Sequence, residues 1–478
     1  MGFIHGAHRH EEILFPERLD DYIAEENPVR FIDAFVDHLN LTTLGFQRAT
    51  PAATGRPAYD QADLLKLYIY GYLYRLRSSR RLEQATHRNV ELMWLLKKLR
   101  PDHKTIADFR KNNLKPIRQV CREFTWLCKQ QDLFAGALVA IDGSKFKAVN
   151  SKERNFTRDK LQRLLGQINQ RVEDYLMELD HRDNHEDVGP PGGAAAENLQ
   201  AKIEALQQRK LLYEGFQAQL EVSGEAQLSL TDPESRAMKL GQGRGTEVCD
   251  NVQTAVDSKH KLIIANDGAH EPGDRDWLSP MALQAKDVLG CTFDAVADVG
   301  YYHGEEVKTC LEAGITPYIA RPITSANKKL GLFSKDDFTY EGATDTYQCP
   351  AGERLTFRFA TVELGRHIRY YATPACKTCM LKQQCTRNKG GRRLTRWVDE
   401  HLLEEMEQRV RSRPEVLKQR KQLVKHPFGT MKRWWDQGFF LMRGLEKVRT
   451  EFSLTVLAYN LRRVLNLIGI PRLIAALG

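Results

Sequence analysis

The sequence predicts a mixed α/β protein with helices ahead of a central sheet. Two short apolar runs, residues 137–141 and 293–297, have the length and composition of buried strands, and an aspartate follows each of them. Residues 27–130 carry helical patterns instead. Residues 161–179 repeat apolar side chains at alternating steps of four and three, which is typical of paired helices. A chain of 478 residues suggests roughly three domains.

The composition is that of a basic protein with enough apolar residues for real cores. Lys and Arg number 71 against 62 Asp and Glu, which gives a net charge of +9, and 42% of the residues are hydrophobic. This charge suits a nucleic-acid partner, although many soluble enzymes carry a similar excess. We expect a cytoplasmic protein that does not enter a membrane, because no apolar run reaches about eighteen residues and residues 1–12 are rich in His and charge.

Residues 27–130 are expected to form short helices joined by tight turns. The dense apolar stretch 64–74 predicts one helix, and Thr105 with Asp108 three residues later predicts the start of another. The basic side chains around these helices suit a helix-turn-helix-like DNA reader. A helical packing domain with a solvated basic face is the alternative. The DNA contacts predicted in this region are Arg77, Arg80 and Arg81.

Two aspartates mark the predicted sheet. The first apolar run is followed by Asp142, and Lys145 and Lys147 come soon after it. We expect the strand to end at Asp142, which would leave the carboxylate at the rim of the sheet and the lysines near a phosphate-bearing partner. An ordinary Asp-Gly turn is the alternative. Asp298 follows the second run, and two such carboxylates can share a divalent ion such as Mg²⁺.

Further strands are expected around these aspartates. Residues 248–257 and 262–267 have the pattern of central strands between them, and residues 315–320 that of a later strand. Asp274 follows the second of these stretches and is a candidate for the outer shell of the site.

The two aspartate segments, together with the later run 424–432, resemble bacterial insertion-sequence transposases of the DDE type. The resemblance extends from the helical start near Pro28 to the run 459–463. It implies a ribonuclease-H-like catalytic domain and an N-terminal region that binds terminal inverted repeats.

The resemblance also implies a chemistry and a set of partners. Asp142 and Asp298 would hold Mg²⁺ or Mn²⁺ for DNA strand cleavage and strand transfer, and Lys432 would contact a flanking phosphate. The implied partners are the terminal inverted repeats and target DNA, bound by a homodimer, in a bacterial protein associated with the nucleoid.

One position departs from the family. Its third metal-binding acid is a glutamate directly before His-Pro-Phe-Gly, and this chain has Lys425 there. A protonated lysine cannot coordinate Mg²⁺, and its charge repels the ion that two aspartates attract. We therefore expect a transposase fold with a damaged centre, which is a decayed copy, a repurposed DNA-binding protein or a deliberate substitution. A catalytically inactive DNA-binding or regulatory protein is the alternative function. A zinc-dependent hydrolase is less favoured, since no HExxH motif is present.

Two insertions are expected within the catalytic region. Residues 157–222 predict a helical hairpin around a Gly/Pro turn at 188–193, and it is either a partner or dimer surface or an intramolecular spacer. Residues 346–399 predict a zinc-ribbon-like unit, with unligated thiols as the alternative. The candidate ligands of its structural Zn²⁺ are Cys349, Cys376, Cys379 and Cys385.

The expected domains are therefore a repeat-binding domain at residues 1–130 and a catalytic domain made of residues 131–345 and 400–478. From about residue 401 the chain reads as helical and very basic, and Trp434, Trp435, Phe439 and Phe440 are interleaved with the charges. Aromatic side chains stack on bases, which favours a nucleic-acid surface over a merely solvated face. The other predicted DNA contacts are Lys145, Lys147, Arg420, Lys421, Arg433 and Trp434.

Overall fold

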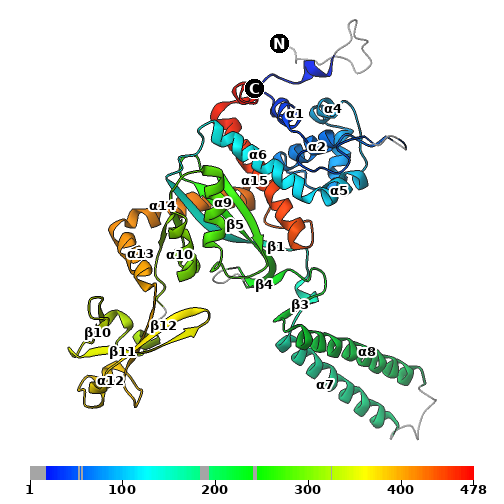
Figure 1. Ribbon diagram of the computed structural model, residues 1–478. Coiled ribbons are helices and arrows are strands. Elements are labelled where there is room, and N and C mark those ends of the chain that lie inside the picture. Colours follow the sequence, from blue (N-terminus) through cyan, green and yellow to red (C-terminus); the bar gives the residue numbers. More distant parts are fainter. Residues whose placement is uncertain (1–17, 52–53, 55–56, 184–192, 241–244, 324–325) are drawn as a thin grey trace, which may run out of the picture.

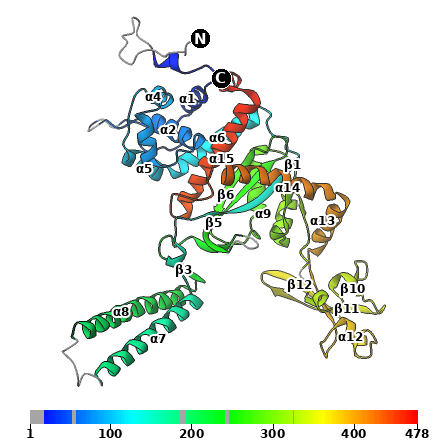
Figure 2. The same cartoon turned by 180° about the vertical axis from the view of Figure 1, so that it is seen from behind.

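The computed structural model describes residues 18–51, 54, 57–183, 193–240, 245–323 and 326–478. A body of helices and one sheet carries two projecting parts, a two-helix arm and a small Cys-rich sheet (Figure 1). The view from behind shows the same arrangement, with the C-terminus beside the N-terminal helices (Figure 2).

The first part of the body is a bundle of short helices. These are α1 (Pro28–His38), α2 (Gln61–Leu73), α3 (Ser79–Thr86), α4 (Val90–Leu95), α5 (His103–Asn112) and α6 (Leu114–Gln130). The start predicted at Thr105 is wrong. The Asp102 carboxylate accepts hydrogen bonds from the amides of Lys104 and Thr105, so Asp102 caps α5 and the helix begins at His103.

The core of this bundle is shared with the C-terminal end of the chain. Helix α2 is buried on all sides, and Tyr68, Tyr70 and Tyr72 are each no more than 1% exposed. The same hydrophobic cluster includes Phe452 and Tyr459 of α15 (Leu445–Ile468), and the short α16 (Ile470–Ala475) follows against α1. The C-terminal helices thus complete the N-terminal bundle.

A mixed sheet forms the centre of the body and confirms the α/β class. The strand order is β4 (Arg236–Lys239), β5 (Thr246–Asp257), β1 (Leu138–Lys147), β7 (Asp294–Ala297) and β8 (Thr316–Ile319), and β6 (Ile263–Ala269) also pairs with β5. Strand β5 is antiparallel to β1, β4 and β6. Strands β7 and β8 run parallel to β1.

Strand β1 does not end at Asp142 as predicted. It pairs with β5 from Val139 to Lys147, and Asp142 lies opposite Thr254 within the ladder. The Asp-Gly pair is therefore part of the strand, because the β5 backbone continues to satisfy its hydrogen bonds. On the β7 side, however, pairing stops at Ala140, so the edge facing β7 opens just before Asp142.

Helices cover both faces of the sheet. Val139 and Ile141 of β1 pack against α9 (Leu278–Leu289) and α10 (Gly304–Glu312), whereas Leu138 and Ala140 pack against α14 (Pro414–Gly429). This division follows from the alternation of side chains along a strand. Helix α13 (Glu400–Ser412) leads into α14, and a wider π-helical turn, Thr430–Trp434, ends it.

The Cys-rich part is a separate small sheet with its own core. Its strands are β9 (Thr339–Glu341), β10 (Thr346–Gln348), β11 (Arg354–Glu363), β12 (Arg366–Ala372) and β13 (Arg393–Trp397), with the short helices α11 (Ala326–Lys329) and α12 (Lys382–Cys385) beside them. Phe338, Tyr347 and Tyr371 are among its buried residues. Because β9 and Phe338 belong to it, this unit begins before residue 346.

The arm is formed by α7 (Arg158–Asp183) and α8 (Gly193–Ser223), and the short strands β2 (Asn155–Thr157) and β3 (Gln227–Ser229) pair at its base. Most of the Gly/Pro turn predicted at 188–193 lies outside the described residues. None of the helices that the structure describes combines the length and apolar character needed to cross a membrane.

Candidate active site and nucleic-acid interface

Asp142 on β1 and Asp298, directly after the parallel strand β7, lie at the same level of the sheet. The last paired residues of β1 and β7 are Ala140 and Val296, and each aspartate lies two residues beyond them. Adjacent strands are about 4.8 Å apart, so this register brings the two carboxylates to one edge of the sheet. The Asp298 carboxylate also accepts a hydrogen bond from the Gly300 amide at 2.7 Å, which fixes its orientation.

A third carboxylate, that of Asp274, lies beside this pair. Its Oδ1 accepts hydrogen bonds from Asn251 Nδ2 and Gln253 Nε2, each at 2.7 Å. The Gln253 side chain accepts a hydrogen bond in turn from the buried Tyr301 hydroxyl. A Cβ added at Gly143 would lie only 2.5 Å from Asp274 Oδ1, so the absence of a side chain there leaves room for this network.

Asp142 is the acid of this group whose pKa is displaced most clearly. Burial raises the pKa of Asp142 to about 7, the nearby charges of Asp298 and Asp274 raise it too, and Arg420 acts in the opposite direction. Arg420 of α14 forms an ion pair with Asp142, with 3.3 Å between Nη1 and Oδ1. The Arg420 side chain is 14% exposed, so it lies against the carboxylate rather than reaching outward as a DNA contact.

A cleft of about 1020 Å³ opens at this edge of the sheet, and we call it the carboxylate cleft. Asp142 and Asp274 line it together with Lys425 and Lys432 from the C-terminal segment. Its other charged lining residues are Lys145, Lys147, Lys239, Glu247 and Arg433. Lys425 is thus in the same cleft as Asp142 and Asp274, and the rim of the cleft is basic.

Lys432 is tied to strand β1. Its Nζ donates to Ser144 Oγ at 2.6 Å and to the Lys145 carbonyl oxygen at 2.5 Å, and it lies 4.5 Å from the centre of the Phe146 ring. These contacts attach the turn after α14 to the strand that carries Asp142. In this structure Lys432 therefore holds two parts of the cleft together.

The carboxylate oxygens of this site suit a hard cation. In this structure, however, they are bonded to protein groups. Among the described residues, no three His, Cys, Asp or Glu side chains are grouped tightly enough to hold a metal ion. Arg420 is the cation that neutralises Asp142 here. Carboxylate oxygens are nevertheless the ligands that Mg²⁺ prefers, so Asp142, Asp298 and Asp274 match that ion in kind.

The predicted DNA contacts divide into exposed and buried residues. Arg77 is wrong as a DNA contact, because it is only 7% exposed and its guanidinium pairs with the buried Glu451. Trp435 and Phe440 are in the core as well. The exposed predicted contacts are Arg80, Arg81, Lys147, Lys421, Arg433 and Trp434, and Lys145 is half-buried with its Nζ on the Lys239 carbonyl oxygen.

The four cysteines of the candidate zinc site line a single cavity of about 20 Å³. Cys349 follows β10, Cys376 and Cys379 come from the turn after β12, and Cys385 ends α12. Burial raises the pKa of the Cys385 thiol, nearby Arg392 lowers it, and the three other thiols raise it. Four thiols around so small a space have the chemistry of a tetrahedral Zn²⁺ site.

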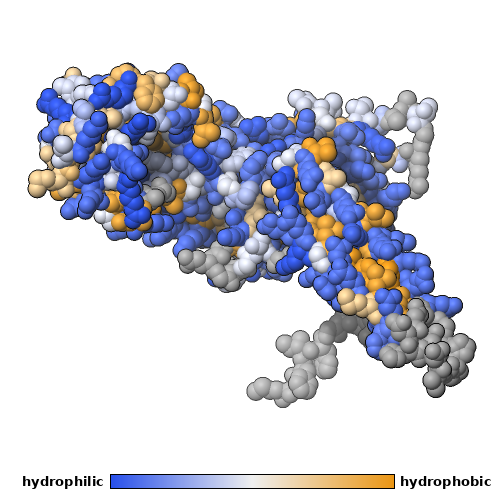
Figure 3. Space-filling view, turned by 90° about the horizontal axis from the view of Figure 1, so that it is seen from below, coloured by the Kyte–Doolittle hydropathy of each residue, from blue (hydrophilic) through white to orange (hydrophobic). Residues whose placement is uncertain are grey.

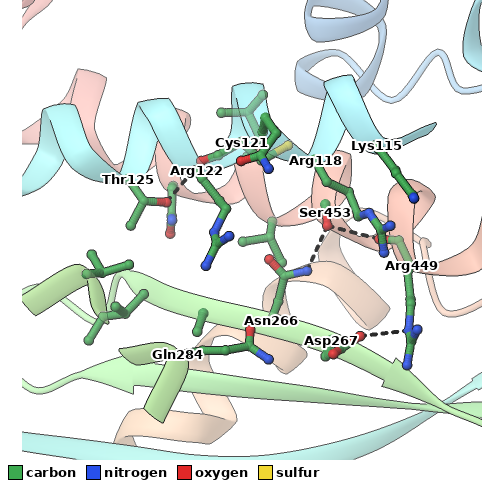
Figure 4. A pocket seen from close by; sticks show the side chains of 17 residues that line it. Lys115, Arg118, Cys121, Arg122, Thr125, Asn266, Asp267, Gln284, Arg449 and Ser453 are labelled. Carbon is green, nitrogen blue, oxygen red and sulfur yellow. Dashed lines mark hydrogen bonds and ion pairs between the residues drawn. The ribbon is translucent and has the colours of Figure 1, made fainter. Parts of the chain in front are cut away.

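A second cleft, of about 440 Å³, lies between α6, β6, α9 and α15. Figure 4 shows Arg122 of α6 pointing into it above Asn266 of β6. Asp267 is the single acid among its described lining residues, and Arg449 is bonded to it at 2.8 Å. This cleft therefore lacks the clustered carboxylates of the first.

Sequence reasoning missed several residues of the carboxylate cleft. Lys239 and Glu247 come from β4 and the start of β5, where no motif marks them. Tyr301 follows Asp298 by three residues, yet its bond to Gln253 depends on the pairing of distant strands. The sequence did offer a signal for Asn251 and Gln253, as polar residues on an expected strand, and for Asp274, which follows the next one.

Comparison with known proteins gives two domain matches. Residues 17–112 match a transposase domain, DUF772, and residues 348–465 match a transposase DDE domain. Among solved structures, the chain is similar to the piggyBac transposase synaptic complex with hairpin DNA, at 9% identity and a TM-score of 0.26, over 94% of this chain and 84% of that chain. No curated protein matches the sequence. The two matched segments contain helices α1 to α5 of the N-terminal bundle and the helix that carries Lys425.

Proposed function

We propose that this chain is a DDE-type transposase, which its match to a transposase domain and its match to a transposase DDE domain support, and that it binds the terminal inverted repeats of an insertion sequence and acts on DNA strands there with Mg²⁺ or Mn²⁺. The observation that carries this proposal is the equal register of Asp142 and Asp298 on parallel strands. Two carboxylates at one sheet edge, beside a basic cleft, suit the chemistry of a phosphodiester bond.

The fold supports the proposal in a second way. Three antiparallel strands, β6, β5 and β1, are followed by the parallel strands β7 and β8. We infer from this order that the central sheet is ribonuclease-H-like, as the resemblance of the sequence implies. Helix α14 packs on one face of the sheet, and its Lys425 lines the same cleft as Asp142 and Asp274.

The roles of the residues follow from their positions. Asp142 and Asp298 would hold the metal ion, which when bound activates water or a 3′-hydroxyl and stabilises the leaving oxygen. Asn251 and Gln253 orient Asp274 beside them. Lys145 and Arg433 at the rim suit the phosphate backbone, whose contacts fix the register of a protein on DNA. Exposed Trp434 is available to stack on a base.

A second function, DNA binding without cleavage, is favoured by two specific contacts. Lys425 is exposed in the carboxylate cleft, and Arg420 already pairs with Asp142. Two cations at the aspartates disfavour a metal ion by direct repulsion. Such a protein would occupy element ends, or regulate them, without cutting.

Both functions require the protein to recognise the element ends. The test is therefore its binding to a duplex that carries one element end. We expect a gel shift in which a scrambled duplex of equal length is a poor competitor. The affinity should fall steeply with increasing salt, as phosphate contacts require. Equal binding to both duplexes would contradict recognition of the ends. Nicking of the same duplex with Mg²⁺ then separates the transposase from the binder.

We further propose that the Cys-rich unit holds one structural Zn²⁺, with Cys349, Cys376, Cys379 and Cys385 as its ligands. Purified protein is expected to carry about one zinc per chain by elemental analysis, as a four-thiolate site requires. The variant Cys379→Ser should lose most of it, whereas Cys291→Ser, which changes an exposed cysteine elsewhere, should keep it. Equal zinc in the two variants would rule out the assignment.

A further inference from the structure

The arm has no neighbour along most of its length. Its helices pack on each other and on β2 and β3 at the base, where Phe156, Leu161 and Leu220 form a small core. Beyond that base the arm projects away from the body in both views (Figures 1 and 2). Helix α8 has 31 residues and is therefore about 46 Å long, so a long surface is left without cover.

The inner face of α8 is used by its contact with α7. Leu199, Ile203 and Leu220 are buried there, and they recur at helical spacing. The opposite face of α8 is different from an ordinary solvated face, because it carries no charge. Leu212 and Val222 on it are 53% and 91% exposed. Seen from below, the arm as a whole carries a band of hydrophobic side chains between hydrophilic ones (Figure 3).

The outer face of α8 can be divided into heptads whose a and d positions mix amide, small and apolar side chains. Its a and d positions are all uncharged and all exposed: Asn198, Ala201, Ala205, Gln208, Leu212, Gly215, Gln219 and Val222. Alternating steps of three and four along one face are typical of a helix that pairs with another helix. Small residues at these positions allow the two backbones to approach closely.

The charges beside this face indicate the partner and its direction. Glu197 and Glu204 lie along one edge, at g positions, and Lys202 and Arg209 lie along the other, at e positions. Each acid precedes a base by five residues, which is the spacing of ion pairs between two parallel helices of the same sequence. An antiparallel pair would place like charges together instead. Within the described part of the chain, Glu197, Glu204 and Arg209 have no ion-pair partner.

We propose that the outer face of α8 binds α8 of a second copy of this chain as a parallel two-stranded coiled coil. Parallel arms hold the two bodies at the same end, so two carboxylate clefts face one pair of DNA ends. This inference rests on the proposed function for its purpose, since action at two element ends needs two copies. Its physical basis, the uncharged face and its edge charges, is independent of that function.

The test uses the full chain without DNA, in two charge-reversed variants. Glu197→Lys with Glu204→Lys is one variant, and Lys202→Glu with Arg209→Glu is the other. Sedimentation is expected to show a dimer for the unaltered chain and a dissociation constant raised at least about tenfold for each variant alone. A one-to-one mixture of the two variants should restore the dimer, because opposite charges then face each other.

The control is Glu173→Lys with Asp180→Lys, an equal charge change on the exposed side of α7, which should leave the dimer unchanged. An unaltered chain that is monomeric, or variants that dimerise as well as it does, would overturn the proposal. So would a one-to-one mixture of the two charge-reversed variants that stays monomeric, since opposite charges would then face each other without holding the helices together. Binding of a single element end is measured in parallel, so a failure of end recognition is distinguished from a failure of dimerisation.

Discussion

Lys425→Glu is expected to give the protein a Mg²⁺-dependent nicking activity at least about 100-fold above that of the unaltered chain. Lys425 is exposed in the carboxylate cleft, on the helix whose Val424 packs on the sheet below the aspartates. The substitution removes a positive charge there and supplies the third acid, and one well-placed ligand or charge contributes several kcal/mol to such a transition state. At about 1.4 kcal/mol per factor of ten, that corresponds to two or more orders of magnitude in rate.

The measurement is the conversion of a supercoiled plasmid that carries both element ends into nicked and linear forms. Asp142→Ala in the Lys425→Glu background should cut nothing. Lys418→Glu is the matched control, because it makes the same charge change on an exposed part of α14 outside the cleft lining, and it should remain as inactive as the unaltered chain.

The opposite result is equally informative. If the unaltered chain cuts as well as Lys425→Glu, another acid completes the site. Asp274 is then the first candidate, because it lines the same cleft and its Oδ1 is already oriented by two amides. Asp274→Asn would abolish cutting in that case, and the assignment of position 425 would be wrong.

The parts of the fold that local sequence determines were predictable. The apolar runs around Asp142 and Asp298 became β1 and β7 because a buried strand leaves a continuous β-branched and alanine-rich signature. The heptad over residues 161–179 became α7 for a similar reason, since its spacing places one face on a partner helix. In each case the pattern itself carries the physical cause.

The parts that depend on distant partners were not predictable. Nothing local to Arg77 shows that Glu451, 374 residues later, will pair with it inside the core. Nothing local to Arg420 shows that it meets Asp142 across the sheet. A basic residue in a charged run has the same sequence signature whether it meets solvent, DNA or a buried carboxylate, so only the fold separates these cases.

The end of β1 and the burial of the aromatic residues also depend on the fold rather than on local sequence. The end of β1 was misplaced because Asp-Gly is a turn signal, and the long antiparallel partner β5 overrides it. Trp434 and Trp435 are neighbours in sequence, yet one is 77% exposed and the other 6%, since the π-helical turn directs them to opposite sides. The sequence alone does not show which of the two tryptophans is exposed.

Glu451 joins the two ends of the chain inside one core. It is fully buried, and both of its oxygens accept hydrogen bonds from the Leu441 amide at 3.0 Å, with Met442 donating a further one at 3.0 Å. Arg77 approaches it to 3.3 Å and donates to the Phe439 carbonyl oxygen at 2.8 Å. This one carboxylate thus fixes the segment between α14 and α15 against the loop before α3.

Glu451→Ala is therefore expected to destabilise the protein by about 3–5 kcal/mol, the usual cost of removing one partner from a buried ion pair. The loss arises because the Arg77 guanidinium stays buried without its carboxylate and two amides lose their acceptor. The measurement is the urea midpoint followed by tryptophan fluorescence, to which buried Trp435 contributes. Glu451→Gln, which keeps the shape and an acceptor oxygen, should lose less.

Glu446→Ala supplies the comparison, because Glu446 lies on the same helix and pairs with Arg118 and Arg449 while remaining 51% exposed. Exposed ion pairs contribute about 0–1 kcal/mol, so its midpoint should barely move. A double variant with Arg77→Ala should lose clearly less than the sum of the two single losses, since the second change removes the charge that the first left unpaired. Equal effects of Glu451→Ala and Glu446→Ala would mean that the core tolerates an unpaired Arg77, and the account of how the two ends of the chain are joined would fail.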